Sequence, residues 1–238
     1  MRRARSDVVG FAVPLASLLL VGCGLDPVRE SEWVSTRDMR LDVRALDDGV
    51  AAAIDVRVES PIGSVVLTGG DALLVTVDGA RRPMSEGERN GAPTYSAQLD
   101  ALSGDFLLDL ERPNDRDVRG VVVEVPPPFT LTAEGLTQDL PLTLGWDPDP
   151  EGASVSIVVQ GDCLDTVTRS LDEDTGALVF TQAELRPPPA GPPLAPCALQ
   201  VTVSRTSATQ GVLFSTTPGG SIVTSAEQRR DIAVTWTP

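Results

Sequence analysis

The sequence contains no histidine and no lysine, and all 19 of its basic residues are arginine. Without histidine the chain lacks the commonest general base and the commonest metal ligand of proteins. Without lysine it has no side chain for a Schiff base or for the lysine of a phosphate-binding loop. Aromatic residues are also scarce, at 4% of the chain, so a sugar-binding platform of exposed rings is not expected.

Positive charge is outnumbered by negative charge. The chain has 34 acidic residues against 19 basic ones, a net charge of −15. A body with this charge is repelled by the phosphates of nucleic acid and by an anionic membrane surface. We therefore expect no nucleic-acid partner. Apolar residues make up 41% of the 238 residues, which is enough for the packed core of one large or two modest domains.

Known catalytic motifs are missing from the sequence. It contains no G-x-S-x-G, S-x-x-K or H-E-x-x-H motif and no phosphate loop. A serine nucleophile would have neither a histidine nor a lysine as its base. We predict that the protein is not an enzyme, with no catalytic residues and no cofactor. The remaining enzymatic alternative is a carboxylate-pair hydrolase, which needs two buried carboxyl groups about 5–10 Å apart.

The N-terminal segment has the layout of an export signal. Three arginines within residues 1–6 precede a mainly apolar run from Val8 to Gly22, and Cys23 follows. The run of about 15 residues is shorter than the roughly 20 that a membrane-spanning helix requires. We therefore expect residues 1–22 to be a signal peptide. The alternatives are a permanent span, or an uncleaved helix in which Cys23 is buried or forms a disulfide.

The end of this run, Leu20-Val21-Gly22-Cys23, resembles the lipobox of bacterial lipoproteins. The resemblance implies cleavage before Cys23, attachment of diacylglycerol to its sulfur and acylation of the new N-terminus. Two or three acyl chains give a stable membrane anchor, whereas one chain gives only marginal binding. In such lipoproteins Asp after the cysteine favours retention in the inner membrane, so Gly24 is compatible with the outer membrane. The implied location is the bacterial cell envelope, on the periplasmic face or the cell surface.

The two remaining cysteines are Cys163 and Cys197. An even pair in an exported protein predicts a disulfide. In the chain-entropy model a bridge across about 35 residues stabilises the fold by roughly 3–4 kcal/mol. A structural zinc site needs four ligands, and a redox pair is usually spaced C-x-x-C, so neither alternative suits this pair.

Hydrophobicity alternates with a period of two from Arg37 onward. Met39, Leu41 and Val43 fall on one face of the first such segment, and charged residues fall on the other. Similar segments recur about every 10–15 residues, separated by turns such as Asp78-Gly79, which is typical of an all-β sandwich. By contrast, Ser225–Asp231 is predicted to be a helical turn or a loop. The predicted strands lie within residues 39–46, 50–60, 64–84, 94–100, 105–112, 118–125, 129–133, 140–146, 153–163, 177–185, 197–205, 211–216 and 231–238.

Three consecutive prolines within residues 125–129 (VPPPF) cannot join a central strand and predict a stiff connector. The expected architecture is therefore two tandem immunoglobulin-like antiparallel β-sandwich domains, residues 37–126 and 127–238, preceded by a lipidated cysteine and tether at 23–36. The parity of Cys163 and Cys197, and of Trp146 and Trp236, places these side chains inward in the second domain. Trp33 lies in the tether, and packing against the first domain is its simplest interpretation.

The β-rich part also resembles bacterial envelope lipoproteins with immunoglobulin-like domains. The similarity lies in residues 67–71 (LTGGD) and 75–79 (VTVDG), and in 219–222 (GGSI) and 236–238 (WTP). It implies a fold but no known activity, so it assigns no functional residues.

Acidic loop residues suggest a calcium site as a further possibility, since calcium takes six to eight oxygen ligands. Asp147, Asp149 and Glu151 form the first candidate cluster, and residues 172–174 and 114–117 form two others. The same residue types are ordinary turn formers, which is the competing interpretation.

These observations favour a lipid-anchored structural or protein-interaction module of the envelope. Its membrane contact would be the lipid on Cys23, and its partner would be an envelope protein of unknown identity. The first alternative is a ligand-binding lipoprotein for a sugar, a peptide or calcium. The second is the carboxylate-pair hydrolase.

Overall fold

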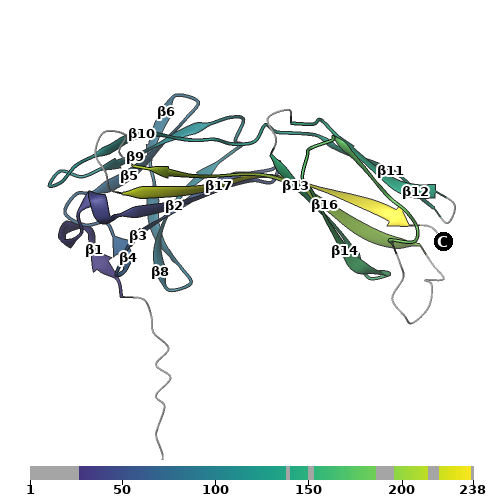
Figure 1. Ribbon diagram of the computed structural model, residues 1–238, viewed down its shortest axis with the longest axis horizontal. Helices are drawn as coiled ribbons and strands as arrows, with labels where there is room; N and C mark the ends of the chain where they lie inside the picture. The colour runs from purple at the N-terminus through teal and green to yellow at the C-terminus, as the bar shows by residue number, and fades with distance from the viewer. Residues whose placement is uncertain (1–26, 138–139, 150–152, 186–195, 214–219, 237–238) are drawn as a thin grey trace, which may run out of the picture.

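The computed structural model consists of two β-sandwiches arranged end to end (Figure 1). The only helices in the described part of the chain are the 3-10 helices η1 (Ser31–Trp33) and η2 (Thr36–Asp38). No helix there is both long and apolar enough to cross a membrane. The predicted all-β class is confirmed. The structure describes residues 27–137, 140–149, 153–185, 196–213 and 220–236.

The expected signal peptide, the lipobox and Cys23 lie outside the described residues, as do Glu151 and residues 186–195, a segment rich in proline.

The first sandwich packs part of a large sheet against a four-stranded sheet. Its share of the large sheet comprises β1 (Arg29–Glu30), β4 (Gly63–Val66), β3 (Ala52–Ser60), β2 (Arg40–Asp47), β8 (Ala92–Leu99) and β7 (Ser85–Arg89). The four-stranded sheet comprises β10 (Val118–Val123), β9 (Phe106–Glu111), β5 (Ala72–Val77) and β6 (Ala80–Pro83).

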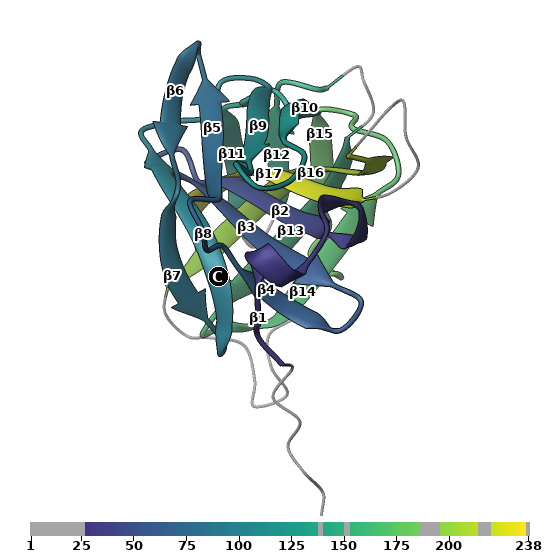
Figure 2. The ribbon, with the colours of Figure 1, turned by 90° about the vertical axis from the view of Figure 1, so that its left-hand side faces the viewer.

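The second sandwich is built in the same way, from the rest of the large sheet and a three-stranded sheet. The four- and three-stranded sheets lie on the same side of the large sheet, as Figures 1 and 2 show from two directions. The large-sheet strands here are β17 (Ser221–Trp236), β16 (Cys197–Val212), β13 (Ser154–Gly161) and β14 (Leu164–Leu171). The three-stranded sheet comprises β11 (Leu131–Thr137), β12 (Leu140–Trp146) and β15 (Ala177–Phe180).

The hairpin of β16 and β17 belongs to both sandwiches. Each strand has 16 residues, and their pairing is continuous from Cys197 opposite Trp236 to Val212 opposite Ser221. The first half of β17 also pairs in parallel with β2 of the first sandwich. Its second half lies in the second sandwich, so one hydrogen-bonded sheet of ten strands runs through the whole molecule.

The C-terminal part of the expected second domain therefore contributes to the first sandwich as well. Leu213, Ile222 and Ala226 were expected in domain 127–238, but they are buried in the core of the first sandwich. The segment Ser225–Asp231, expected to be a turn or loop, lies inside β17. A two-residue period predicts a strand but not the strand with which it pairs. The residues of Ser225–Asp231 have a weak preference for strands, but backbone hydrogen bonds to a strand on each side stabilise the extended conformation.

Many predicted orientations are confirmed. Met39, Leu41 and Val43 are buried in the first core, and Trp146 and Trp236 pack in or against the second. Such inward faces follow directly from the alternation of side chains along a strand.

The expected tether is shorter than predicted. Arg29 and Glu30 already pair in parallel with β4, and η1 follows at once. Trp33 does not pack on the first domain as expected, because its side chain is 81% exposed.

The shared hairpin predicts that both sandwiches unfold together. Ile222→Ala removes a buried side chain of the first core, so it should lower the free energy of unfolding by about 2–5 kcal/mol. Trp146 and Trp236 report on the second sandwich, and their fluorescence in a urea titration should show this loss as one cooperative transition.

Val223→Ala is the matched control, because Val223 points to the opposite face of β17 and should cost less than about 1 kcal/mol. Two separate transitions, with the tryptophan signal unchanged by Ile222→Ala, would contradict the shared-hairpin account.

Candidate functional site at the junction of the sandwiches

The two hydrophobic cores are separated by a layer of polar side chains, which we call the junction layer. On β17 the inward side chains change from Ala226 in the first core to Gln228 and Arg230 at the boundary. On β16 the corresponding inward residue is Arg205, which follows Val203 of the second core. We define the junction layer as Arg205, Gln228 and Arg230 with their carboxylate partners Asp47 and Asp174.

Arg205 is the most deeply buried member of the junction layer, with 1% of its side chain exposed. Its Nε donates to Oδ2 of Asp174 at 2.9 Å, and its Nη2 lies 2.7 Å from the same oxygen. Nη1 donates to the carbonyl oxygen of Pro127 at 2.8 Å, and Nη2 also donates to the carbonyl oxygen of Asp147. One guanidinium thus joins β16 to the linker and to two loops of the second sandwich.

Arg230 holds the linker from the neighbouring strand. Its Nε donates to the carbonyl oxygen of Phe129 at 3.1 Å, and its Nη1 lies 3.3 Å from Oδ1 of Asp47. The Phe129 ring is contacted by both guanidiniums, Arg205 at 4.7 Å and Arg230 at 5.4 Å from its centroid. Cations over an aromatic face are attracted by the ring quadrupole, more strongly when water is excluded, and Phe129 is buried.

Asp47 extends the same network into the first sandwich. Its Oδ2 accepts from the N–H of Leu102 and its Oδ1 from the N–H of Gly49, both at 2.7 Å. Gln228 donates its Nε2 to the carbonyl oxygen of Leu102 at 2.8 Å. Side chains of the shared hairpin therefore position the loop before β9 as well as the linker.

The proline-rich linker is held along the shared hairpin by hydrogen bonds and does not act as a hinge between the sandwiches. Proline fixes φ and has no N–H, so these residues offer only carbonyl oxygens for hydrogen bonding. The shared hairpin supplies three donors along the linker: Ser207 Oγ to Glu124, and the guanidiniums of Arg205 and Arg230 to Pro127 and Phe129. Bending at this point would break all three bonds, which indicates a fixed angle between the two sandwiches.

Asp174 is held as an anion at the junction. It accepts hydrogen bonds from the Trp146 indole at 2.6 Å and from the N–H groups of Asp149 and Gly176 at 2.9 and 3.1 Å. Burial acts to raise the pKa of Asp174. These hydrogen bonds and the charge of Arg205 outweigh burial, so the pKa is lower than its ordinary value.

Two of the three residues of the candidate calcium cluster, Asp147 and Asp149, lie beside the partners of Arg205, and Glu151 lies outside the described residues. The Asp147 carboxylate accepts from the Thr130 hydroxyl at 3.3 Å, while the Asp147 carbonyl accepts from Arg205. Asp149 is buried at the same loop. No group of three Asp, Glu or Cys side chains suited to a metal ion occurs within the described residues. The guanidinium of Arg205 occupies the position beside Asp174 that a cation would take.

The acidic stretch at 114–117 has an arginine partner too. Asp115 accepts from the N–H of Thr36 at 2.8 Å and from Arg112 at 3.0 Å, and Arg112 is 3% exposed. Burial acts to raise the pKa of Asp115, but its hydrogen bonds from Thr36 and Arg116 and the charge of Arg112 lower it overall. Arg112 also pairs with the buried Asp71 at 2.8 Å.

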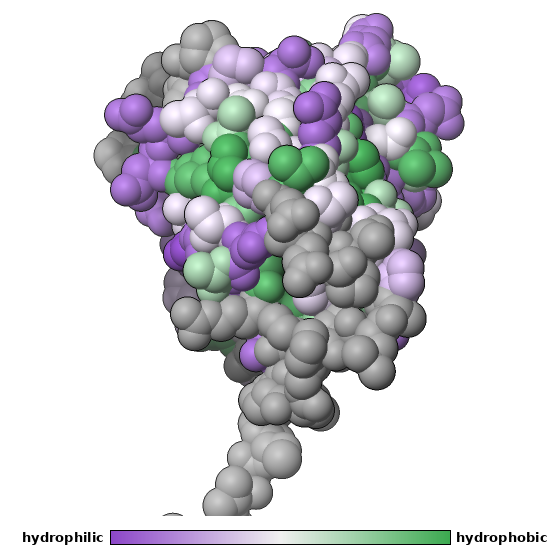
Figure 3. All heavy atoms as spheres, turned by 90° about the vertical axis from the view of Figure 1, so that its right-hand side faces the viewer, coloured by the Kyte–Doolittle hydropathy of each residue, from purple (hydrophilic) through white to green (hydrophobic). Residues whose placement is uncertain are grey.

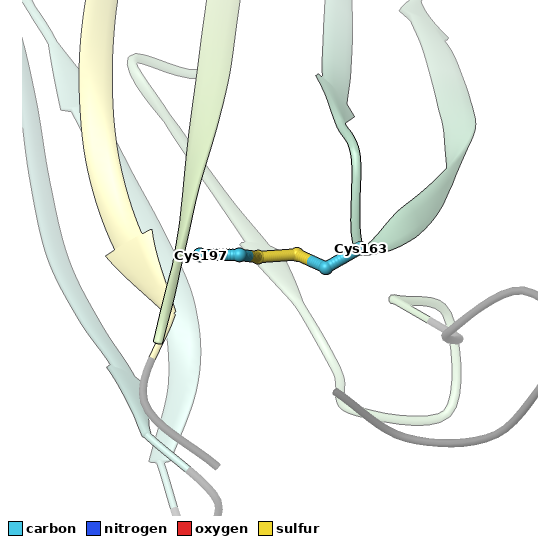
Figure 4. Close-up of a disulfide and its surroundings, with 2 residues drawn as sticks. All are labelled: Cys163 and Cys197. Atoms are coloured by element: carbon cyan, nitrogen blue, oxygen red, sulfur yellow. A yellow bond between two sulfur atoms is a disulfide. The ribbon is translucent and has the colours of Figure 1, made fainter. Parts of the chain in front are cut away.

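The predicted disulfide between Cys163 and Cys197 is confirmed (Figure 4). Their Cα atoms are 6.3 Å apart, and 34 positions separate them in sequence. Cys163 follows the end of β13 and Cys197 begins β16, so the bond closes the end of the second sandwich that is farthest from the junction.

An open groove of about 700 Å³ lies on the outer face of the second sandwich, over β13, β16 and β17. Its lining combines polar residues with aliphatic ones and contains no aromatic ring; the polar residues are Gln160, Asp162, Thr166, Gln200 and Asp231. This groove lacks the aromatic stacking surface that most sugar sites use.

Sequence reasoning did not single out Arg112, Arg205 or Arg230. Arg205 could have been found from the alternation along its strand. It follows Leu199, Val201 and Val203 at every second position, so it faces the same side as these buried residues. A charged residue at an inward position must find partners, because an unpaired buried charge is costly.

Arg205→Leu should destabilise the protein strongly, because it leaves Asp174 buried without its charge partner. We expect a loss of about 3–5 kcal/mol in the free energy of unfolding, measured by urea titration. Arg169→Leu is the matched control: it breaks the exposed Arg169–Glu184 pair and should cost less than about 1 kcal/mol. Equal losses for the two variants would contradict the role assigned to Arg205.

Below about pH 8, stability should depend on pH only in the acid range. The sequence has no histidine, so no side chain with an ordinary pKa titrates between about pH 5 and 8. Asp174 and Asp115 have lowered pKa values in the fold, so their stabilisation is complete above their unfolded pKa of about 3.9. It is lost as the pH falls through the lower folded values.

Urea titrations should therefore give a constant free energy of unfolding from about pH 5 to 8 and a decline below about pH 4. Asp174→Asn should be less stable than the unaltered protein at pH 7, and its decline in acid should be shallower. An identical acid decline for the two proteins would show that Asp174 is not a source of the pH dependence.

No family model matches the chain, and no curated protein matches it. Among solved structures it is similar to a cytokine receptor complex, at 12% identity and a TM-score of 0.33 over 84% of this chain and 96% of that one. It is also similar to the adhesin InvE of Yersinia pseudotuberculosis, at 11% identity and a TM-score of 0.23 over 82% of this chain and 59% of that one. A third similar structure is trypsin-activated alpha-2-macroglobulin from Escherichia coli, at 14% identity and a TM-score of 0.25 over 85% and 16% of the two chains. Likenesses of this size carry no argument about function.

Proposed function

We propose that this protein is a lipid-anchored, rigid interaction module of the bacterial cell envelope, which presents its second sandwich to a protein partner. The observation that carries the proposal is the junction, where the buried Arg205 and the partly buried Arg230 of the shared hairpin bind the linker. A fixed junction keeps the distal sandwich at a constant distance and direction from the anchored end.

The positions of the chain ends suit this role. Residue 29 enters the fold at one end of the long axis, and β17 ends at the other (Figure 1). Only five residues separate Cys23 from Arg29 in the sequence. A lipid on Cys23 would therefore hold the first sandwich close to the membrane and project the second one away from it.

The disulfide adds support for the compartment. Such bonds persist mainly in oxidising surroundings, which include the bacterial periplasm and the cell surface. The bond between Cys163 and Cys197 lies at the distal end, away from the proposed anchor.

The distal end has a mixed surface. Figure 3 shows apolar side chains lying among polar ones over this end of the second sandwich. Leu140, at the start of β12, and Val179 of β15 are each at least half exposed. A mixture of this kind is typical of non-obligate protein interfaces, which are about as apolar as the rest of a protein surface.

Fractionation of cells that produce Cys23→Ser tests the anchor. The variant cannot carry a thioether-linked lipid, so it should leave the membrane fraction and the detergent phase, and mass spectrometry of its N-terminus should find no acyl chains. The matched control is the double variant Cys163→Ser/Cys197→Ser, which loses the other thiols and should stay in the membrane fraction. Retention of Cys23→Ser in the membrane to the same extent as the unaltered protein would refute the proposed anchor.

A further inference from the structure

Trp33 is presented to solvent while the other two tryptophans lie in or against the second core. Its side chain is 81% exposed, and its indole N–H is 3.3 Å from a carboxylate oxygen of Glu30. Trp146 is buried and Trp236 packs against the second core. Aromatic residues are rare in this chain, so one displayed indole is a feature that the fold itself does not use.

The exposure of Trp33 is imposed by a rigid scaffold. Arg112 donates from Nη2 to the carbonyl oxygen of Ser31 at 2.6 Å and from Nη1 to that of Val34 at 2.9 Å. Ser31 and Val34 are buried, and the Ser31 hydroxyl also accepts from the N–H of Thr68 at 2.8 Å. The backbone is therefore fixed on both sides of Trp33, and the indole is held outward rather than left on a loose chain.

Two more apolar side chains are exposed near the point where the chain enters the fold. Val28 is 49% exposed, and it precedes β1, which pairs with β4. Ile62 is 57% exposed and lies next to Gly63, whose Cα faces the Pro27 carbonyl closely enough to exclude a larger residue. β1 and β4 lie at the end of the first sandwich that faces the viewer in Figure 2. We call Val28, Trp33 and Ile62 the tether-end patch.

We infer that the tether-end patch lies in the interfacial layer of a lipid bilayer, with the Trp33 indole at the level of the headgroups. The inference rests on the proposed lipid anchor. Five residues from Cys23 to Val28 span at most about 18 Å when fully extended, so an acylated Cys23 keeps the patch close to the headgroups. Tryptophan is enriched at membrane–water interfaces because its ring is apolar and its N–H is polar.

The negative charge of the protein favours zwitterionic over anionic lipid. The whole chain carries −15, and Glu30 and Glu32 lie beside Trp33 in the sequence. An anionic bilayer repels such a surface, whereas a zwitterionic one offers ammonium groups to these carboxylates. The expected partner is therefore a bilayer surface rich in zwitterionic lipid.

The contact would set the orientation of the protein. A lipid anchor alone fixes one point of the chain and leaves the body free to tilt. A second point of contact at Trp33, held by Arg112, would limit that tilt. Because the junction layer fixes the second sandwich relative to the first, the distal end would then point in a defined direction from the membrane.

The chain from Cys23 to Pro238 offers a direct test, since Cys23 is its one free thiol once Cys163 and Cys197 are bridged. The protein is coupled through Cys23 to a maleimide lipid in phosphatidylcholine vesicles with plain or brominated acyl chains. The emission of Trp33 is taken as the difference between the unaltered protein and Trp33→Phe. It should shift to shorter wavelength and fall about twofold or more with brominated lipid, because the ring of an indole at the headgroups borders the upper ends of the acyl chains.

The matched control moves the reporter away from the patch. Val50 is 87% exposed in the turn after β2, on the junction side of the first sandwich. In the double variant Trp33→Phe/Val50→Trp the introduced indole should not be quenched by brominated lipid. Replacing most of the phosphatidylcholine by phosphatidylglycerol should weaken the quenching of Trp33.

Equal Trp33 emission in plain and brominated vesicles would overturn the inference, even where fractionation supports the lipid on Cys23. Quenching of the introduced indole in the Trp33→Phe/Val50→Trp control to the same extent as Trp33 in the unaltered protein would also overturn it, since contact would then be unspecific. Because the anchor in this experiment is chemical, membrane retention of Cys23→Ser in cells would refute the proposed anchor separately.

Discussion

The pairing of β16 with β17 over their full length is the constraint on which both sandwiches depend. One half of the hairpin supplies strands to the first core, and the other half supplies strands to the second. Any change in the angle between the sandwiches has to distort this pairing or the junction layer. Rigidity in this molecule is therefore a property of the backbone ladder, to which the linker is fastened by Arg205 and Arg230.

Two buried arginines and one partly buried arginine each join separate segments of the chain. Arg112, Arg205 and Arg230 each bind a carboxylate and at least one backbone carbonyl oxygen. A guanidinium carries five donors in a fixed plane, so it can hold several acceptors at once, which a lysine ammonium does less well. A buried ion pair alone adds little net stability, but here it defines which loop lies against which strand.

Strands and inward faces could be predicted because alternation is local, as in Met39, Leu41 and Val43. The disulfide was predicted from the even pair of cysteines left once Cys23 is set aside, and the inward parity of Cys163 and Cys197 is consistent with it. The strand pairing of Ser225–Asp231 could not be predicted, since its partners in β2 are remote in sequence. Acidic clusters have the same local appearance whether their partner is a metal ion or a distant arginine, so Asp147 and Asp149 suggested calcium. The dipeptide Asn90-Gly91 has left-handed φ angles of 56° and 77°, and Asn-Gly is a typical hairpin turn. Because the strands were predicted without this turn, β7 was not among them.

The parallel contact of β17 with β2 has a consequence for how the molecule is made. Asp47 and Arg230, which meet at the junction, are 183 positions apart. A chain that is synthesised or exported from its N-terminus first exposes β2 with one edge unpaired, and residues 221–228 close that edge only at the end. Contacts of such long sequence separation form late in folding. A chain that ends before residue 221 therefore lacks the strand that pairs with β2 in the first sandwich and with β16 in the second.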